Sequence, residues 1–318
     1  MKKLIITTFC IFFVTLAAPI NAASFLVFGD MPYSFVDTQM LQKDGRLFNA
    51  VQKEQHDFIV HVGDLKASIQ SCSDSLLTEN YQLISSVSSK PFVYTPGDND
   101  WTDCDRESLL EPKDELERLD FIRKNFAYHS IELEQFQRQP TQPENQAWRA
   151  ENIQYVTLHV VATNNGRRQI NLSDKRKALN AVDARDSLNL LWLGKFLGSE
   201  KPSAMVIFMQ ADLFVKQKND KRCDDKRQKK CDGLRVYRER LDALAQQVDF
   251  PILLVHGDTP KYCFSKRSSG LWQLNAPGDV KVIDIAKVMV DANDVQQPFR
   301  VSSLLGSALP ECPFSSED

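Results

Sequence analysis

The stretch Phe58-Ile59-Val60-His61-Val62-Gly63-Asp64 decides the fold, because a mostly apolar run ends there in a glycine and an acid. The same arrangement recurs before Gly29-Asp30, Gly97-Asp98 and Gly257-Asp258, which follow apolar runs at 25–28, 92–94 and 252–255. Apolar runs without alternation are typical of strands that are buried on both faces. The repeated pattern therefore predicts a helix-covered sheet with Gly-Asp turns at the ends of its strands.

Amphipathic stretches separate the apolar runs. We expect helices at about 38–55, 73–86, 112–125, 184–197 and 234–247, and further strands at 153–161, 204–209, 280–290 and 299–302. There is no internal repeat and no Gly/Ser linker. The pattern predicts a single domain over residues 23–318, built as a four-layer α/β/β/α sandwich.

Polar residues collect just beyond the predicted strands. Asp30, Asp64, Asp98, Asp212, His256 and Asp258 all have such positions. Because strand carboxyl ends line the ligand crevice of α/β sheets, these side chains should converge. One acid at a strand end is often only a helix cap or a turn former. Several in matching positions indicate a site for hard cations, which prefer oxygen ligands.

The motifs around these acids are similar to those of the calcineurin-like metallophosphoesterases, over most of residues 23–318. That family has Asp-x-His, Gly-Asp-x-x, Gly-Asn-His-Asp/Glu, a later His, and Gly-His-x-His. This chain has Asp30-Met-Pro32, Gly63-Asp64, Gly97-Asp98-Asn99-Asp100, Gln210-Ala-Asp212 and Gly257-Asp258-Thr-Pro260. It most resembles a group of exported bacterial members, and it lacks several of the family's histidines.

The resemblance implies a phosphoesterase with two divalent metal ions. Asp64 would bridge the ions, Asp30 would bind the first and Asp98 the second, with Asp212, His256 and Asp258 completing the ligand shells. Carboxylates in place of imidazoles favour Mn²⁺, Mg²⁺ or Ca²⁺, with Fe²⁺ and Zn²⁺ as further possibilities. Asn99 stands where the family has a catalytic His and cannot donate a titratable proton, so His256 is the only nearby candidate donor. We therefore expect activity on aryl or other activated phosphomonoesters or phosphodiesters. The alternative is a catalytically degenerate binding protein that keeps the fold.

Three residues are candidates for binding the anionic substrate: Asn164, Lys216 and Lys218. The two lysines belong to a basic segment, 216–230, that begins just after Asp212 and could attract an anion. A solvated loop and, for Asn164, a simple turn are the alternatives. A formal net charge of −3 gives no indication of a nucleic-acid partner.

The N-terminus resembles a secretory signal peptide over residues 1–22. Lys2 and Lys3 precede a short apolar run that ends near Ala22; an uncleaved anchor is the alternative. The remaining six cysteines suit an oxidising compartment, periplasmic or extracellular. We prefer the pairs Cys72–Cys104, Cys223–Cys231 and Cys263–Cys312. A thiolate zinc site is the competing interpretation, although no C-x-x-C pair exists.

Overall fold

The computed structural model describes residues 23–313, except 199, 217, 218, 225 and 260. The predicted signal peptide, residues 1–22, lies outside this part. Two sheets form the centre of the fold. The first has the order β12 (Phe299–Ser303), β11 (Ala286–Val290), β1 (Ala23–Phe28), β2 (Phe58–His61), β3 (Phe92–Tyr94). The second has the order β4 (Gln137–Gln139), β5 (Gln142–Ala150), β6 (Ile153–Thr157), β7 (Ala204–Phe208), β8 (Ile252–His256), β10 (Leu271–Asn275), β9 (Cys263–Ser268).

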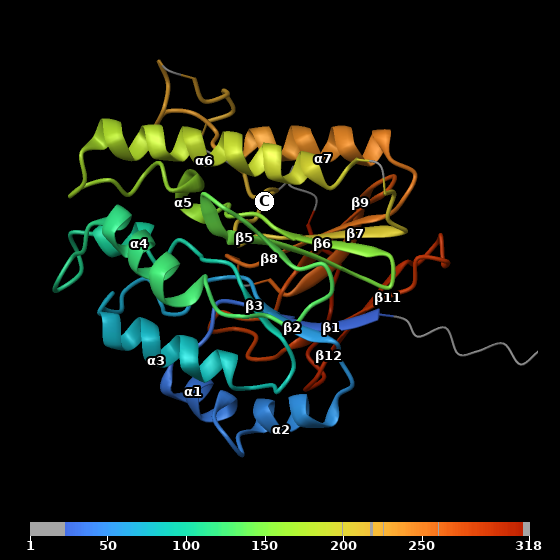
Figure 1. The fold of residues 1–318 in the computed structure, drawn as a ribbon. Helices are drawn as coiled ribbons and strands as arrows, with labels where there is room; N and C mark the ends of the chain where they lie inside the picture. Colours follow the sequence, from blue (N-terminus) through green and yellow to red (C-terminus); the bar gives the residue numbers. More distant parts are fainter. Residues whose placement is uncertain (1–22, 199, 217–218, 225, 260, 314–318) are drawn as a thin grey trace, which may run out of the picture.

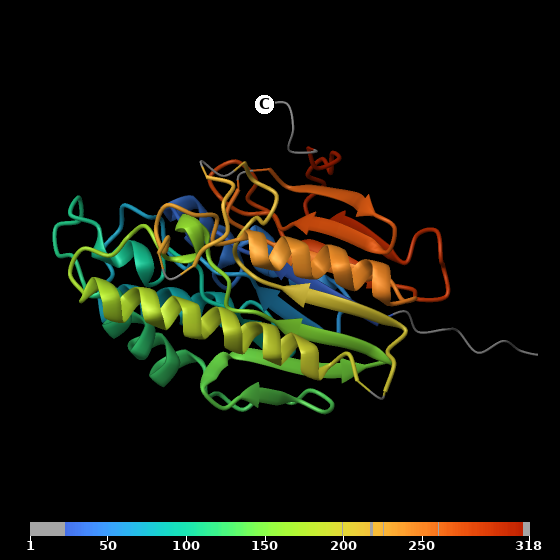
Figure 2. The ribbon, with the colours of Figure 1, turned by 90° about the horizontal axis from the view of Figure 1, so that it is seen from above.

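Helices cover the outer faces of both sheets (Figures 1 and 2). On the side of the first sheet lie α1 (Phe35–Leu41), α2 (Arg46–Lys53), α3 (Asp74–Ser85) and α4 (Glu115–Phe126); α6 (Lys175–Lys195) and α7 (Arg235–Gln247) cover the second. Side-chain oxygens cap the amino ends of α1, α3, α4 and α6, supplied by Ser34, Ser73, Asp114 and Asp174. The predicted four-layer sandwich is confirmed.

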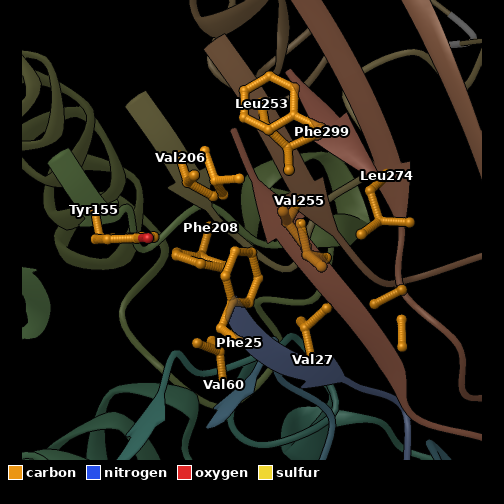
Figure 3. Packing of buried hydrophobic residues seen from close by; sticks show 14 of the residues in the cluster. Phe25, Val27, Val60, Tyr155, Val206, Phe208, Leu253, Val255, Leu274 and Phe299 are labelled. Carbon is orange, nitrogen blue, oxygen red and sulfur yellow. The ribbon is translucent and has the colours of Figure 1, made fainter. Parts of the chain in front are cut away.

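The central core lies between the two sheets and consists of their inward-facing side chains. Phe25 stacks on Phe58, and both meet Tyr155 of the second sheet edge to face. Figure 3 shows Val60, Phe208 and Val255 in the same cluster. A further apolar cluster lies between each sheet and the helices that cover it. This layering accounts for the apolar runs, since these strands are covered on both faces.

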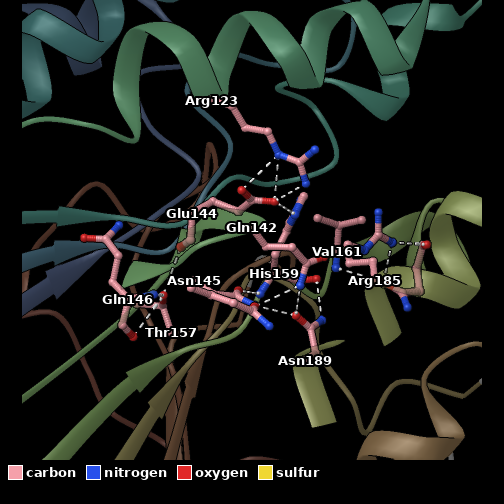
Figure 4. A network of polar contacts seen from close by, with 12 residues as sticks. Arg123, Gln142, Glu144, Asn145, Gln146, Thr157, His159, Val161, Arg185 and Asn189 are labelled. Atoms are coloured by element: carbon pink, nitrogen blue, oxygen red, sulfur yellow. Dashed lines mark hydrogen bonds and ion pairs between the residues drawn. The ribbon is translucent and has the colours of Figure 1, made fainter. Parts of the chain in front are cut away.

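A buried polar network joins helices and strands at one side of the second sheet (Figure 4). Glu144 of β5 accepts hydrogen bonds from Arg123 of α4 at 2.7 Å and from His159 Nδ1 at 2.8 Å. Asn189 of α6 donates to the His159 carbonyl at 2.9 Å. The network thus links a helix beside the first sheet to strands of the second.

Several predicted elements differ from the observed ones. The helix expected at 38–55 is two helices, because the chain turns at Asp44 with φ +68° and restarts at Gly45, the N-cap of α2. The strands expected at 153–161 and 280–290 are shorter than predicted, and the helix expected at 184–197 begins at Lys175. Strands β4, β5, β9 and β10 were not predicted.

Candidate functional site

The loops after β1, β2, β3 and β8 bring four acids together. Asp30, Asp64 and Asp258 have left-handed backbone conformations, with φ of 51°, 65° and 71°. The glycines that precede acids permit this close approach. A Cβ on Gly97 would lie 1.9 Å from Asp64 Oδ1, and one on Gly257 would lie 2.5 Å from Asp30 Oδ2. The Gly-Asp pattern therefore reflects crowding at the ends of the strands.

One amide nitrogen lies among three of the carboxylates. Gln210 Nε2 is 3.3 Å from Asp64 Oδ2, 3.1 Å from Asp98 Oδ1 and 3.4 Å from Asp258 Oδ1. Its oxygen accepts from Ala162 N at 2.7 Å, which fixes the direction of the amide. An amide has two hydrogens and no charge, so it balances these oxygens only in part.

The fourth carboxylate, Asp30, is joined to Asp64 by a tyrosine hydroxyl. The Tyr33 oxygen lies 3.2 Å from Asp30 Oδ1 and 3.0 Å from Asp64 Oδ2. Asn99 donates its side-chain N–H groups to the Tyr33 oxygen at 3.0 Å and to Asp64 Oδ2 at 2.9 Å. Thr163, in the left-handed turn α5 (Ala162–Asn165), donates to Asp98.

Asp100 and a disulfide hold these loops in place. The Asp100 carboxylate accepts from the backbone N–H groups of Asp64, Leu65 and Gly97, at 3.0, 2.6 and 2.7 Å. The disulfide Cys72–Cys104 joins the segment after β2 to the 3₁₀ helix η1 (Thr102–Asp105). Hydrogen bonds and a disulfide therefore hold together the loops that carry Asp64 and Asp98.

The shared burial of these acids disfavours their charged forms. Burial raises the pKa of Asp30 to about 7 and also raises the pKa values of Asp64, Asp98 and Asp258. For Asp64 and Asp258, repulsion from Asp98 and Asp30 adds to the effect of burial. In their charged forms, the four carboxylates would therefore need more positive charge than the neutral donors around them supply.

The four carboxylates lie in a cleft of about 630 Å³. Arg106 and Lys216 also line it, and Arg106 forms an ion pair with Asp103. The cleft thus combines acids with cationic side chains.

Two of the predicted metal ligands do not line this cleft. Asp212 Oδ1 accepts from Phe214 N at 2.8 Å, as in a local turn. The His256 ring is fully buried: Nδ1 donates to the Gly257 carbonyl at 2.9 Å, which leaves Nε2 to accept from Gln273 at 2.7 Å. With both ring nitrogens engaged, His256 lacks the position we predicted for a metal ligand and proton donor.

The predicted substrate-binding residues have different outcomes. Lys216 is exposed and lines the cleft. Asn164 borders the cleft, but its amide donates to the Cys231 carbonyl at 3.1 Å and accepts from Gly233 N at 2.8 Å. These contacts hold a loop, and substrate binding by Asn164 stays a prediction. Lys218 lies outside the described residues.

The six cysteines form the pairs that we preferred: Cys72–Cys104, Cys223–Cys231 and Cys263–Cys312. Three disulfides are compatible with a periplasmic or extracellular location. No described helix is long and apolar enough to cross a membrane.

Tyr33 and Thr163 are site residues that sequence analysis missed. Tyr33 lies only three residues after Asp30, but an isolated tyrosine in a turn carries no signal of its own. Thr163 lies just beyond the strand expected at 153–161, in a left-handed turn that the local sequence does not indicate. Gln210 marks a family histidine position, and its hydrogen bonds among the carboxylates follow only from the packing of β7 against β6 and β8.

The carboxylates fit a hard divalent cation in their chemistry but not in their present arrangement. Within the described residues, no group of three or more His, Cys, Asp or Glu side chains is arranged to hold a metal ion. The Gln210 amide and the Tyr33 hydroxyl instead occupy the space between the carboxylates. Cation binding among Asp64, Asp98 and Asp258 would require the Gln210 amide nitrogen to move away. Pro32 offers no donor to a second ion, and Pro260 lies outside the described part.

Comparisons with known proteins give the fold. No family model and no curated protein sequence matches the chain. Its structure is similar to that of PhoD, with a TM-score of 0.50 and 12% identity over 94% of this chain and 73% of PhoD. A 5'-nucleotidase from Candida albicans has a TM-score of 0.48 and 10% identity over 89% of this chain and 52% of that one. A dimetal phosphatase from Danio rerio has a TM-score of 0.46 and 11% identity over 84% and 95%. The similarity to PhoD shows the fold alone, and this is the metallophosphoesterase fold that the motifs predicted.

Proposed function

We propose that the protein is an exported, cation-dependent phosphoesterase. One observation carries the proposal: four carboxylates, buried in Asp30, Asp64 and Asp98 and half-buried in Asp258, meet in a cleft that Lys216 also lines. Repulsion among them is relieved most directly by a hard cation. The three disulfides support export.

These carboxylates would hold one or two divalent ions, with Mn²⁺, Mg²⁺ or Ca²⁺ preferred. When bound, such ions stabilise the charge on a phosphoryl group and activate water. Asn99 keeps Asp64 oriented through two hydrogen bonds, from its backbone and its side chain. Lys216 would attract the phosphate, with Lys218 as a further candidate.

The preferred leaving group follows from the lack of a side chain that could protonate it. Asn99 has no titratable proton, and both ring nitrogens of His256 are engaged. The preferred substrates are therefore aryl or otherwise activated phosphomonoesters or phosphodiesters, whose alcohols leave without protonation by the protein.

A second candidate function is a binding protein that keeps the fold without catalysis. The hydrogen bonds of Gln210, Tyr33 and Asn99 favour it, because they partly satisfy the carboxylates without a cation.

Metal analysis and hydrolysis separate the two candidates. Purified protein, dialysed against Mn²⁺, Mg²⁺, Ca²⁺, Zn²⁺ or Fe²⁺ in turn, would be assayed for bound metal and for hydrolysis of p-nitrophenyl phosphate and bis-p-nitrophenyl phosphate. We expect stoichiometric metal and hydrolysis, both lost in Asp64→Asn and both retained in the exposed control Asp44→Asn. Absence of bound metal and of hydrolysis under every condition would reject the enzyme in favour of the binding protein.

A further inference from the structure

Exposed aliphatic side chains surround the mouth of the carboxylate cleft. Ile69, Val215 and Val280 line the cleft and are 84%, 41% and 67% exposed. We refer to these three residues as the apolar rim.

The apolar rim comes from three separate loops. They follow the carboxyl ends of β2, β7 and β10, and the same end of the sheets carries the acids. Single exposed apolar residues are normal on protein surfaces. Side chains from three loops around one opening instead form a shared surface, which is typical of a binding site.

Acidic, cationic and apolar side chains therefore occupy different parts of the cleft. Carboxylates lie among its buried residues, cationic side chains of Arg106 and Lys216 line it, and the exposed members of the apolar rim lie at its mouth. A phosphate would meet the cations, and the group attached to it would extend toward the rim. The rim is aliphatic, so it offers dispersion and desolvation rather than hydrogen bonds.

We infer that the substrate is an amphiphilic phosphoester, with an alkyl chain that lies against Ile69, Val215 and Val280. This inference deepens the proposed function and rests on it for the phosphate end. Each methylene that the rim removes from water should strengthen binding by about two- to fourfold, by the usual transfer free energy of a buried methylene.

The test compares p-nitrophenyl alkyl phosphodiesters with alkyl groups of increasing length, from ethyl to octyl, all below their critical micelle concentrations. Nitrophenolate leaves without protonation from each ester, so only the alkyl chain retained on phosphorus differs. We expect kcat/KM to rise with chain length. The double variant Ile69→Ser/Val280→Ser should reduce the octyl-to-ethyl ratio by about tenfold. Val295→Ser is the matched control, because Val295 is 78% exposed in the loop between β11 and β12, at the opposite end of the first sheet. It should leave the ratio unchanged.

A binding measurement keeps the inference separate from the proposed function. Titration calorimetry with octylphosphonate and ethylphosphonate, which are not hydrolysed, needs no catalysis. Tighter binding of the octyl compound, weakened in the double variant, is the expected result. Equal affinity for the two compounds, or an unchanged ratio in the double variant, would overturn the inference even if aryl esters are hydrolysed.

A second arm identifies the source of the chain. Co-sedimentation with phosphatidylcholine vesicles that contain phosphatidic acid, lost in the double variant, would point to a bilayer lipid. A chain-length effect without co-sedimentation would point to a dispersed ester.

Discussion

The side-chain amide of Gln210 lies at the point where three carboxylates of the cleft converge. Its nitrogen lies within 3.4 Å of three carboxylate oxygens, and its oxygen is held by Ala162 N. An amide nitrogen cannot bind a cation, because its lone pair is delocalised. Gln210 therefore weakens cation binding at the point where the acids converge.

Replacing Gln210 by a ligating side chain should increase metal affinity. We expect Gln210→His and Gln210→Glu to bind Mn²⁺ about tenfold tighter or more, since each adds a donor beside Asp64 and Asp98. Titration calorimetry measures the change. Gln296→His, on the exposed loop between β11 and β12, is the control and should bind as the wild type does. Unchanged affinity in both Gln210 variants would contradict this role for the amide.

Tyr33 stabilises the acids in a different way, through its hydroxyl between Asp30 and Asp64. Tyr33→Phe leaves these buried oxygens with fewer donors, which costs about 1–3 kcal/mol. In EDTA the Tm should therefore fall, and saturating Mn²⁺ should raise the Tm of the variant by more than that of the wild type. Tyr128→Phe, at an exposed position, should change neither value. An equal response of Tyr33→Phe and wild type to Mn²⁺ would disprove this compensation.

At the residue scale, sequence alone placed the acids better than their partners. Asp30, Asp64, Asp98 and Asp258 converge because each follows a strand in a glycine turn, and both features are visible in the sequence. His256 also ends a strand, yet its ring turns toward Gln273 within the sheet. The face to which a strand-end side chain points depends on register, which the local pattern does not specify when both faces are buried.

At the scale of elements, apolar runs predicted β1, β2, β3, β7 and β8 to within a residue or two. The missed strand β5 carries Gln142, Glu144, Asn145 and Gln146, all buried. A strand whose polar side chains are satisfied by a buried network has no apolar pattern to reveal it. Loop crowding likewise split the helix at 38–55 through a left-handed residue that propensity does not indicate.

The three disulfides act on different elements and should differ in their effects. Cys72–Cys104 closes 32 residues and ties together the loops that hold Asp64 and Asp98, whereas Cys223–Cys231 closes only 8. Chain-entropy estimates give about 4 and about 2.5 kcal/mol for the two loops. We expect Cys72→Ser/Cys104→Ser to lower both the Tm and Mn²⁺ affinity.

The matched pair variant Cys223→Ser/Cys231→Ser should lower the Tm by less and leave Mn²⁺ affinity close to that of the wild type. Differential scanning calorimetry and metal titration measure both quantities. Equal losses of metal affinity in the two double variants would show that Cys72–Cys104 has no special relation to the site.

At the scale of the whole molecule, each of the two sheets contributes part of the cleft. Asp30, Asp64 and Asp98 come from the first sheet, and Asp258 and Gln210 come from the second. The two sheets must therefore keep a fixed relation for the acids to meet. The apolar core between them supplies most of the stability, while directional contacts such as the Glu144 network fix one arrangement.

A substitution at Glu144 tests the role of that network, because Glu144 is buried and joins α4 to the second sheet through Arg123 and His159. Although burial alone would raise its pKa, hydrogen bonds from His159 and Arg123 lower the pKa of Glu144 to about 2. The folded state thus binds fewer protons than the unfolded state between pH about 2 and its ordinary value of 4.5. The carboxylate therefore contributes about 3 kcal/mol of stability above pH 4.5, lost as the pH falls toward 2.

Glu144→Gln should lower the free energy of unfolding in urea by about that amount at pH 7, and the difference from wild type should shrink as the pH falls below 4.5. Burial lowers the pKa of His159 to about 4, so its imidazole is neutral at pH 7. The stabilisation at that pH therefore comes from the charged Glu144 carboxylate and not from an ion pair with His159. Glu200→Gln removes an exposed partner of Arg149 and should cost less than about 1 kcal/mol at any pH. If the difference in free energy of unfolding between Glu144→Gln and wild type stays constant from pH 7 to pH 3, then packing, and not the charge of Glu144, fixes the relative position of the two sheets.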